Sequence, residues 1–380
     1  MKITTKAVGL GVAKDRTGSI SFPIYQTSTF AHPAFGESTG YDYSRSGNPT
    51  RHVLEEGIAQ LEGGCRGFAY ASGLAALSGI LLLFEPGDHF VVTEDLYGGT
   101  FRLLDKVFRK YGLKSSYVDT SNLADFKAAL TSQTKAVILE TPTNPLLKIA
   151  DIQAISNICK DKQILLIVDN TFLTPYLQKP LDLGADIVVH SASKYLSGHN
   201  DVVAGLVVAK DEALAEKIYF YQNSVGAVLG PQDSWLIIRG IKTLGIRMDR
   251  QESNAKTVAS WLNARKDVLK VFYPGLTTHP GFHLQQKQAS GFGAMIAFEV
   301  ENQIFAEKIL NNVKIISYAE SLGGVESLIT FPSYQTHADM LETERERVGI
   351  NNRLLRLSVG IEDIDDLLED LHQALEAGGS

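Results

Sequence analysis

Four short polar clusters follow directly on runs of apolar residues, and each carries side chains that can take part in chemistry. They are Ser72-Gly73-Leu74, the segment 140–145, Asp169-Asn170-Thr171 and the segment 191–195. The most informative side chain is Lys194, because a lysine at the end of a buried run is desolvated and its pKa falls. Only the neutral amine attacks a carbonyl group, so this position favours a lysine that forms an imine.

Each cluster taken singly also has an ordinary structural interpretation. Ser72 is a common type of helix N-cap, and the segment 140–145 fits a proline-bracketed turn. Asp169 at the mouth of a strand could equally cap a helix, and Lys194 could extend its ammonium group to solvent. The clusters therefore carry functional information only in combination.

Together the clusters match what pyridoxal phosphate requires of a protein. The cofactor needs a lysine that forms an imine, a carboxylate that keeps its pyridine nitrogen protonated, a phosphate site and a flat group on its ring. Lys194 and Asp169 supply the first two, and a small turn at a helix start presents backbone N–H groups to a phosphate. The residues that suit the phosphate and stacking positions are Ser72, Gly73, Leu74 and Ser193, and Tyr97 for the ring.

These clusters need a framework that brings strand ends together, and the pattern from about residue 51 to residue 210 predicts one. Short continuous apolar runs alternate with amphipathic stretches of helix length, such as Gly98–Tyr111 and Ile149–Cys159. This alternation is typical of a doubly wound α/β domain with a mostly parallel sheet, where ligands bind beyond the carboxyl ends of the strands. The predicted strands are Gly67–Ala71, His89–Thr93, Lys114–Val118, Ala136–Glu140, Leu165–Asp169, Ile187–His190 and Ala204–Val208.

A chain of 380 residues is longer than one hydrophobic core usually serves, so we expect more than one domain. Residues 1–50 show no packed element but many aromatic side chains, which predicts an ordered arm lying on another surface, such as a partner subunit. Residues 51–240 form the predicted cofactor-binding α/β domain, and residues 241–380 a smaller α+β domain. In its last helix, 362–376, we expect the acidic residues on a solvated face rather than in a calcium site.

Composition and charge exclude several classes of function. Lys and Arg number 36 against 43 Asp and Glu, which gives a net charge of −7 and a pI near 5.8. This acidic balance disfavours binding to nucleic acid or to an anionic membrane surface. The two cysteines, Cys65 and Cys159, form no disulfide framework, and the N-terminal segment lacks the apolar run of a secretory signal. We therefore expect a cytoplasmic enzyme.

Eight segments, in order from residue 43 to residue 360, resemble the Cys/Met-metabolism family of pyridoxal-phosphate enzymes. The segments are YSRSGNPT (43–50), ASGLA (71–75), YGGT (97–100), ETPTNP (140–145), VDNT (168–171), SASKY (191–195), ESLGG (320–324) and LRLSVG (355–360). They span nearly the whole chain, and their common order is far more specific than any one of them. The resemblance implies a fold-type I pyridoxal-phosphate enzyme.

The resemblance also implies a role for each matching residue. Lys194 would hold the cofactor covalently and later move protons, Asp169 would pair with the pyridinium nitrogen, and Tyr97 would stack on the ring and act as a base or proton carrier. Asn144 would lie near the 3-hydroxyl of the cofactor. The residues around the phosphate would be Ser72, Gly73, Leu74, Ser191 and Ser193. Ser321 and Arg356 would hold the substrate α-carboxylate, for which a bidentate arginine is the expected partner.

By the same resemblance, Tyr43 and Arg45 would reach the phosphate of a neighbouring subunit. This gives the aromatic arm a purpose and implies a homotetramer built as a dimer of dimers. Active sites would then be completed only in the assembly.

Two positions favour a particular reaction within the family. Methionine γ-lyases carry a cysteine after Tyr-Gly, where this chain has Gly99, and Glu320 resembles the acidic residue of enzymes that act on cystathionine. A carboxylate there would attract the distal ammonium of L-cystathionine. We therefore expect α,γ-elimination to cysteine, 2-oxobutanoate and ammonia, with side activity on homocysteine or cysteine. The alternatives are a cystathionine β-lyase, which yields homocysteine and pyruvate, and a γ-synthase.

The sequence gives weaker support to two other enzyme classes. Ser191 and Lys194 also fit the S-x-x-K motif of serine acyl-transfer enzymes, but the S-D-N and K-T-G motifs that accompany it do not occur. A metal hydrolase built on Asp169, His190 and His199 is conceivable, although His190 lies in an apolar run and is expected to be a core residue. We predict no metal ion and no role as a non-catalytic binding module.

Overall fold

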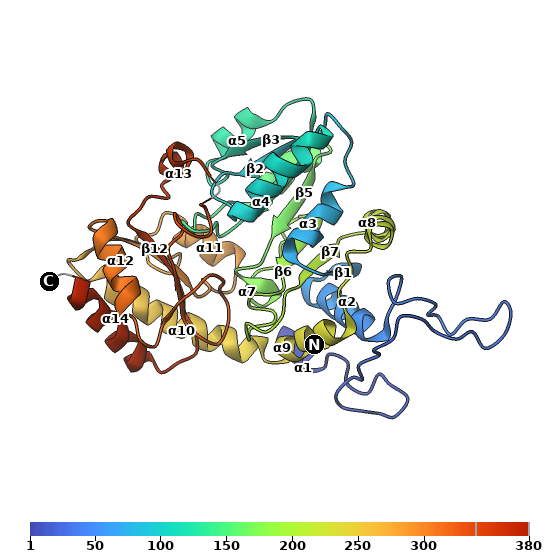
Figure 1. Cartoon of the computed structure of the whole chain (residues 1–380). Helices are drawn as coiled ribbons and strands as arrows, with labels where there is room; N and C mark the ends of the chain where they lie inside the picture. The colour runs from blue at the N-terminus through green and yellow to red at the C-terminus, as the bar shows by residue number, and fades with distance from the viewer. Residues whose placement is uncertain (339, 379–380) are drawn as a thin grey trace.

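The computed structural model describes residues 1–338 and 340–378, and its largest element is a seven-stranded sheet (Figure 1). The strand order is β1-β7-β6-β5-β4-β2-β3. Strand β7 runs antiparallel to β1 and β6, and the other neighbouring pairs are parallel. The strands are β1 (Arg66–Tyr70), β2 (His89–Thr93), β3 (Lys114–Val118), β4 (Thr134–Glu140), β5 (Leu165–Asp169), β6 (Ile187–Ser191) and β7 (Gly205–Ala209). All seven predicted strands are confirmed within two residues at either end.

Both faces of this sheet are buried. Along β6, Val188 packs in one apolar cluster while Ile187 and Val189 pack in a second cluster on the opposite face. Helices α2 (Pro49–Glu62) and α6 (Ile152–Asp161) contribute to the first cluster, and α3 (Gly73–Leu81) and α8 (Glu212–Val225) to the second. A parallel sheet covered on both sides explains why its strands are continuous apolar runs.

The helix that starts nearest the predicted stacking residue is irregular. Residues 98–111, predicted as one helix, form the short α4 (Gly98–Arg102), a π-helical turn (Leu103–Val107) and a 3-10 turn (Phe108–Tyr111). Such π-helical turns occur often at functional sites. Helices α5 (Leu123–Ala129) and α7 (Thr174–Leu177) complete the connections between the strands of the large sheet.

A second, smaller sheet has five strands in the order β10-β11-β12-β9-β8, with one parallel pair, β10–β11. Its strands are β8 (Val268–Phe272), β9 (Met295–Val300), β10 (Ser317–Tyr318), β11 (Leu328–Thr330) and β12 (Leu354–Ser358). The surrounding helices are α9 (Pro231–Lys242), α10 (Leu244–Asn263), α11 (Phe282–Gln288), α12 (Gln303–Asn312), α13 (Glu342–Val348) and α14 (Ile364–Gly378). Because α10 contacts α7 and α9 as well as β8 and β9, the domain boundary at residue 240 stays a prediction.

The N-terminal region corrects one expectation. Residues 1–50 were expected to hold no packed element, yet Ile3–Val8 form helix α1, whose Ala7 is buried against α2. Helix α2 begins at Pro49 because the Asn48 side chain accepts a hydrogen bond from the backbone N–H of Thr50. Between these helices the chain runs as loops that project from the body of the molecule (Figure 1), and their role as an arm on a neighbouring subunit stays a prediction.

The last helix differs from a second expectation, that its acidic residues lie on a solvated face. Asp370 was expected on a solvated face, but it is buried, and its carboxylate accepts hydrogen bonds from the backbone N–H groups of Lys314, Ile315 and Ile316 at 2.8–2.9 Å. It therefore ties α14 to the segment that leads into β10. Among the described residues, no helix is both long enough and apolar enough to cross a membrane.

Candidate active site

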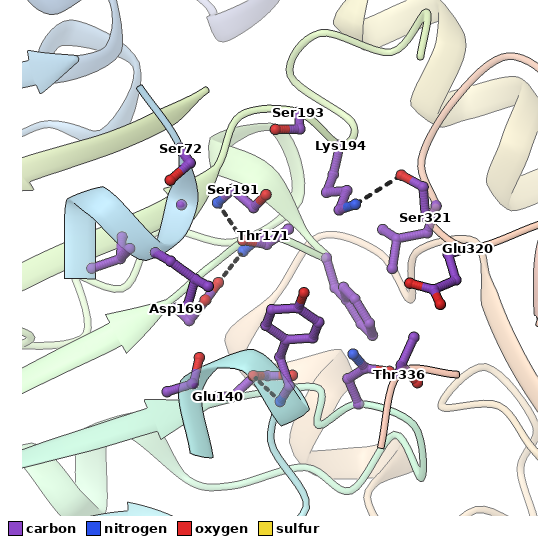
Figure 2. Close-up of a pocket in the computed structure, with 18 of the residues that line it drawn as sticks. Ser72, Glu140, Asp169, Thr171, Ser191, Ser193, Lys194, Glu320, Ser321 and Thr336 are labelled. Carbon is purple, nitrogen blue, oxygen red and sulfur yellow. Dashed lines mark hydrogen bonds between the residues drawn. The ribbon is translucent and has the colours of Figure 1, made fainter. Parts of the chain in front are cut away.

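A cavity of about 860 Å³ lies where the carboxyl ends of the parallel strands face the smaller sheet. It is lined from one side by residues that follow β1, β4, β5 and β6, and from the other by the segment 317–322 and by Arg356 on β12. In Figure 2 the labelled residues of both sides, among them Asp169, Lys194 and Ser321, lie around a common space. Twelve of the predicted site residues line it: Ser72, Gly73, Leu74, Tyr97, Asn144, Asp169, Ser191, Ser193, Lys194, Glu320, Ser321 and Arg356.

Lys194 lies between the two sides of the cavity. Its Nζ donates a hydrogen bond to Oγ of Ser321 at 2.7 Å (Figure 2). Burial, together with the positive charge of Arg356, lowers the pKa of Lys194 to about 8, while the carboxylate of Glu320 acts in the opposite direction. A substantial fraction of this amine is therefore neutral near physiological pH, which is what a nucleophilic lysine needs.

Two carboxyl groups lie side by side at the ends of β4 and β5, where Glu140 pairs in register with Asp169. Asp169 accepts a hydrogen bond from the backbone N–H of Thr171 at 2.9 Å, and Glu140 accepts one from the backbone N–H of Tyr97 at 3.1 Å (Figure 2). Burial and then the charge of Asp169 raise the pKa of Glu140 well above its usual range. Burial also raises the pKa of Asp169, but the hydrogen bonds from Thr171 oppose this shift. Asp169 is thus the better candidate for the ionised carboxylate.

The start of α3 and the end of β6 form a narrow polar cup. Oγ of Ser72 caps α3 by accepting from the backbone N–H of Ala75 at 3.0 Å. A Cβ added to Gly73 would lie 3.1 Å from the Cβ of Ser191, so a side chain at this position would crowd the space between the helix start and β6. The N–H of Ser191 donates to Oγ of Thr171 at 2.8 Å. The cup combines a helix N-terminus with hydroxyl groups, which suits a phosphate.

Arg356 is buried on β12 and spans the floor of the cavity. Its Nη1 donates to Oδ1 of Asn144 at 2.8 Å, and its Nη2 donates to the carbonyl of Ser321 at 3.1 Å and to Oγ1 of Thr330 at 3.2 Å. Its buried Nε has no hydrogen-bond partner within the described chain. Burial lowers the pKa of Arg356 to about 10, so the guanidinium stays charged at neutral pH. Arg356 also lines the cavity, so its positive charge is available to an anionic ligand there.

Tyr43 and Arg45 lie outside this cavity. The Arg45 guanidinium is 5.6 Å from the centre of the Tyr43 ring, and Tyr43 is half exposed on the arm. Their expected place at the phosphate of a neighbouring subunit stays a prediction.

The two histidines of the metal-hydrolase hypothesis have other hydrogen-bond partners. His190 is fully buried, with Nε2 at 2.7 Å from Oε1 of Glu62, so it is a core residue as predicted. Nδ1 of His199 lies 2.7 Å from the carbonyl oxygen of Ser197. In the part of the chain that the structure describes, no three His, Cys, Asp or Glu side chains gather in an arrangement suited to a metal ion.

The cavity also contains residues that received no predicted role of their own. Glu140 ends a buried apolar run, so its place at a strand exit was a usable signal. Thr171 follows Asp169 directly and belongs to the same polar cluster in the sequence. Thr336 lies in an irregular loop of the smaller part, where no periodicity or motif points to it.

Comparisons with known proteins cover the whole chain. The sequence model for the family described as Cys/Met metabolism PLP-dependent enzyme matches residues 4–376. A cystathionine beta-lyase of Lactococcus lactis is 55% identical over 375 residues, which cover 98% of this chain and 99% of that protein. A cystathionine gamma-lyase of Bacillus subtilis is 51% identical over 377 residues, covering 99% and 100%. The crystal structure of a cystathionine gamma-lyase from Lactobacillus plantarum, complexed with L-serine, matches with a TM-score of 0.97 at 48% identity over 100% of both chains.

This chain therefore belongs to the Cys/Met metabolism family of PLP-dependent enzymes, and its cofactor is pyridoxal 5'-phosphate. The resemblance read from the eight segments and the predicted fold type are both confirmed. The relatives carry the names of beta-lyases and of gamma-lyases. Family membership thus defines the cofactor and the sulfur amino acid chemistry, but not which carbon–sulfur bond is cleaved.

Proposed function

We propose that this enzyme cleaves L-cystathionine by α,γ-elimination, giving cysteine, 2-oxobutanoate and ammonia, with side activity on homocysteine or cysteine. The observation that carries the proposal is the placement of Lys194, hydrogen-bonded to Ser321, in one cavity with Glu320 and Arg356. These groups supply a base, an anchor for the α-carboxylate and a carboxylate for a second, distal ammonium. Cystathionine presents such a second ammonium, as does cystine, whereas methionine, cysteine and homocysteine do not.

The described side chains fit the cofactor. The cup in front of α3 has the helix terminus and the hydroxyl groups that a phosphate needs, and the ionised candidate Asp169 suits the pyridinium nitrogen. When bound, the cofactor accepts the electron pair that is released at the substrate α-carbon. The residues that would hold it are Lys194, Asp169, Tyr97 and Asn144 around the ring, and Ser72, Gly73, Leu74, Ser191 and Ser193 around the phosphate.

The chain's own side chains would then handle the substrate as follows. The charged guanidinium of Arg356, which Asn144 and Ser321 hold in place, binds the α-carboxylate. The neutral amine of Lys194 removes the α-proton, and a base then removes a β-proton so that the γ-thiolate can leave. One water molecule is consumed when 2-oxobutanoate and ammonia are released, which balances the reaction. The backbone N–H of Tyr97 donates a hydrogen bond to Glu140, and its side chain lines the cavity, where the phenolic hydroxyl would carry a proton.

The surroundings of Tyr97 support a preference against methionine. A Cβ added at Gly99 would lie 2.4 Å from Cε1 of the Tyr97 ring. A cysteine at this position, as in methionine γ-lyases, therefore requires a different position of the Tyr97 ring. The present ring position and the cysteine are mutually exclusive.

A β-lyase reaction is the second candidate, because a relative at 55% identity carries that name. It would give homocysteine, pyruvate and ammonia from the same substrate, and a γ-synthase reaction would use similar residues. The deciding experiment identifies the keto acid that purified enzyme forms from L-cystathionine, by mass spectrometry, after its cofactor absorption band has been recorded. Mostly 2-oxobutanoate supports the γ-lyase. Mostly pyruvate contradicts it, together with the role given to Glu320.

We further propose a homotetramer in the cytoplasm, in which Tyr43 and Arg45 act in the neighbouring site. Phe35, fully exposed on the projecting arm, supports a covering partner surface, since large aromatic side chains are rarely left in solvent. The two unpaired cysteines suit a reducing compartment. Light scattering of the purified protein tests the tetramer, because a monomeric mass would contradict it, and cell fractionation tests the location.

A further inference from the structure

His337 is a buried histidine that joins three parts of the candidate site. Its Nε2 lies 3.1 Å from the carbonyl oxygen of Leu96 and 3.1 Å from that of Asn144. Leu96 precedes the stacking candidate Tyr97. Carbonyl oxygens only accept hydrogen bonds, so Nε2 must carry the proton of the ring.

The other ring nitrogen then has a defined role. Burial, together with the positive charge of Arg356, lowers the pKa of His337 to about 4, so the imidazole is neutral at physiological pH. With the proton on Nε2, Nδ1 is an acceptor, and it lies 2.8 Å from Oγ1 of Thr336. The Thr336 hydroxyl must therefore donate its single proton to His337.

The direction of this hydrogen bond determines which hydrogen bonds the Thr336 hydroxyl can form with a bound molecule. Thr336 and Glu320 both line the cavity, and Figure 2 labels both of them there. With its proton directed at His337, its oxygen presents only lone pairs to a bound molecule, so it accepts hydrogen bonds and donates none. The loop is firmly placed, because a Cβ added at Gly98 would lie 2.2 Å from the Thr336 carbonyl oxygen.

We propose that His337 is a positioning residue, which locks the Thr336 hydroxyl as an acceptor and so makes it, together with Glu320 of the same cavity, a selector for substrates with a distal N–H donor. The inference rests on the proposed function, since it concerns how that site recognises the far end of its substrate. A hydroxyl free to rotate would accept from a donor or donate to an acceptor equally well. The locked hydroxyl discriminates between the two.

The test compares two substrates of the same bond type. L-cystathionine carries the distal ammonium, and S-ethyl-L-homocysteine is a γ-thioether without it. In Thr336→Val the acceptor is lost, and in His337→Gln the side-chain amide keeps a donor near the Nε2 position but offers no acceptor at Nδ1. Both variants should lower the ratio of kcat/KM for cystathionine to that for the ethyl compound by roughly tenfold, chiefly through KM. In the double variant the two losses should not add, because both remove the same interaction.

Matched controls separate this role from a general structural one. Thr336→Ser keeps the hydroxyl and should keep the ratio, and Tyr334→Phe removes a hydroxyl on the exposed side of the same segment, where it accepts from Gln303 at 2.7 Å. The visible circular dichroism of the bound cofactor should stay unchanged in His337→Gln. It should change in His337→Phe, which also releases the carbonyls of Leu96 and Asn144.

The possible failures are distinguishable. A wild-type enzyme with a normal cofactor band but no turnover of cystathionine overturns the proposed function itself. Normal turnover together with an unchanged substrate ratio in Thr336→Val overturns the present inference alone. Additive losses in the double variant also overturn it, because Thr336 would then act independently of His337.

Discussion

The ammonium of Lys194 and the hydroxyl of Ser321 are hydrogen-bonded at 2.7 Å although the residues lie 127 positions apart in the chain. Lys194 follows the last parallel strand before β7, and Ser321 lies in the loop between β10 and β11 of the smaller sheet. The bond therefore crosses from one sheet to the other, and it positions the amine on which the proposed chemistry depends.

Removing the Ser321 hydroxyl should impair catalysis more than folding. Ser321 has a positive φ of 99°, a conformation that glycine adopts without strain. Ser321→Ala and Ser321→Gly both lose the acceptor for Lys194, so kcat/KM should fall roughly tenfold in each. Ser321→Gly should be the more stable of the two by roughly 0.5–1 kcal/mol, as measured by urea unfolding. Full activity in both variants would show that the hydrogen bond is dispensable.

Replacing Lys194 should abolish covalent attachment of the cofactor. Borohydride treatment of the wild-type enzyme should fix the cofactor to the peptide that contains Lys194, detectable by mass spectrometry. Lys194→Ala should show neither this adduct nor measurable turnover, and Lys194→Arg serves as a control that keeps the positive charge. An adduct on another lysine would refute the assignment.

Adding one carbon at Gly99 should displace the Tyr97 ring. The added Cβ of Gly99→Ala would lie 2.4 Å from the ring, so we expect at least a roughly tenfold loss of kcat/KM and an altered visible circular dichroism of the cofactor. Gly230→Ala is the matched control, because its added Cβ would meet no atom within 4 Å. If the two variants behave alike, the position of Tyr97 does not matter for the reaction.

Asp95 should give the folded protein a pH dependence of definite sign. Burial raises the pKa of Asp95 to about 7, although Lys148 and the Thr143 hydroxyl oppose the shift. Between pH 4 and pH 7 the folded form keeps a proton that the unfolded chain, with an ordinary pKa near 3.8, has released. The free energy of unfolding should therefore fall as pH rises through this window, by at most about 1.4 kcal/mol per pH unit from this group.

The variant Asp95→Asn isolates that contribution, because its amide cannot release a proton. Urea unfolding of both proteins from pH 5 to pH 8 should show the wild type losing stability relative to the variant as pH rises. Parallel pH profiles would mean that Asp95 is already ionised at pH 5.

Mixed oligomers should reveal whether Arg45 acts in the neighbouring site. Arg45→Ala and Lys194→Ala should each be nearly inactive alone. Co-expressed as one assembly, they should regain about a quarter of wild-type activity, since half of the symmetric pairs are mixed and each holds one intact site. Lys194→Ala mixed with Arg356→Ala is the control and should stay inactive, because both residues line the same cavity. No recovery in the first mixture would place Arg45 outside the partner's site.

The sequence was informative wherever a local pattern had a single physical cause. Buried parallel strands need continuous apolar runs, and ligands bind where those runs end, so Asp169 and Lys194 could be found without a structure. Thr336 and His337 could not, because their roles depend on contacts with Leu96 and Asn144 that are distant in the chain. The burial of Asp370 could not be predicted for a similar reason. An acidic residue on an amphipathic helix is expected to face solvent unless the distant backbone that it binds is known.

The polar side chains that follow β1, β4, β5 and β6 all come from one edge of the large sheet, whereas the apolar residues behind them fill the core. Residues at this end of the sheet that do not pack against the strands can be exchanged without disturbing the core. A change from one elimination reaction to a related one would therefore require substitutions in these loops but no change in the sheet. In such enzymes the large sheet would stay the same, while the loops at the carboxyl ends of its strands would differ with the bond that is cleaved.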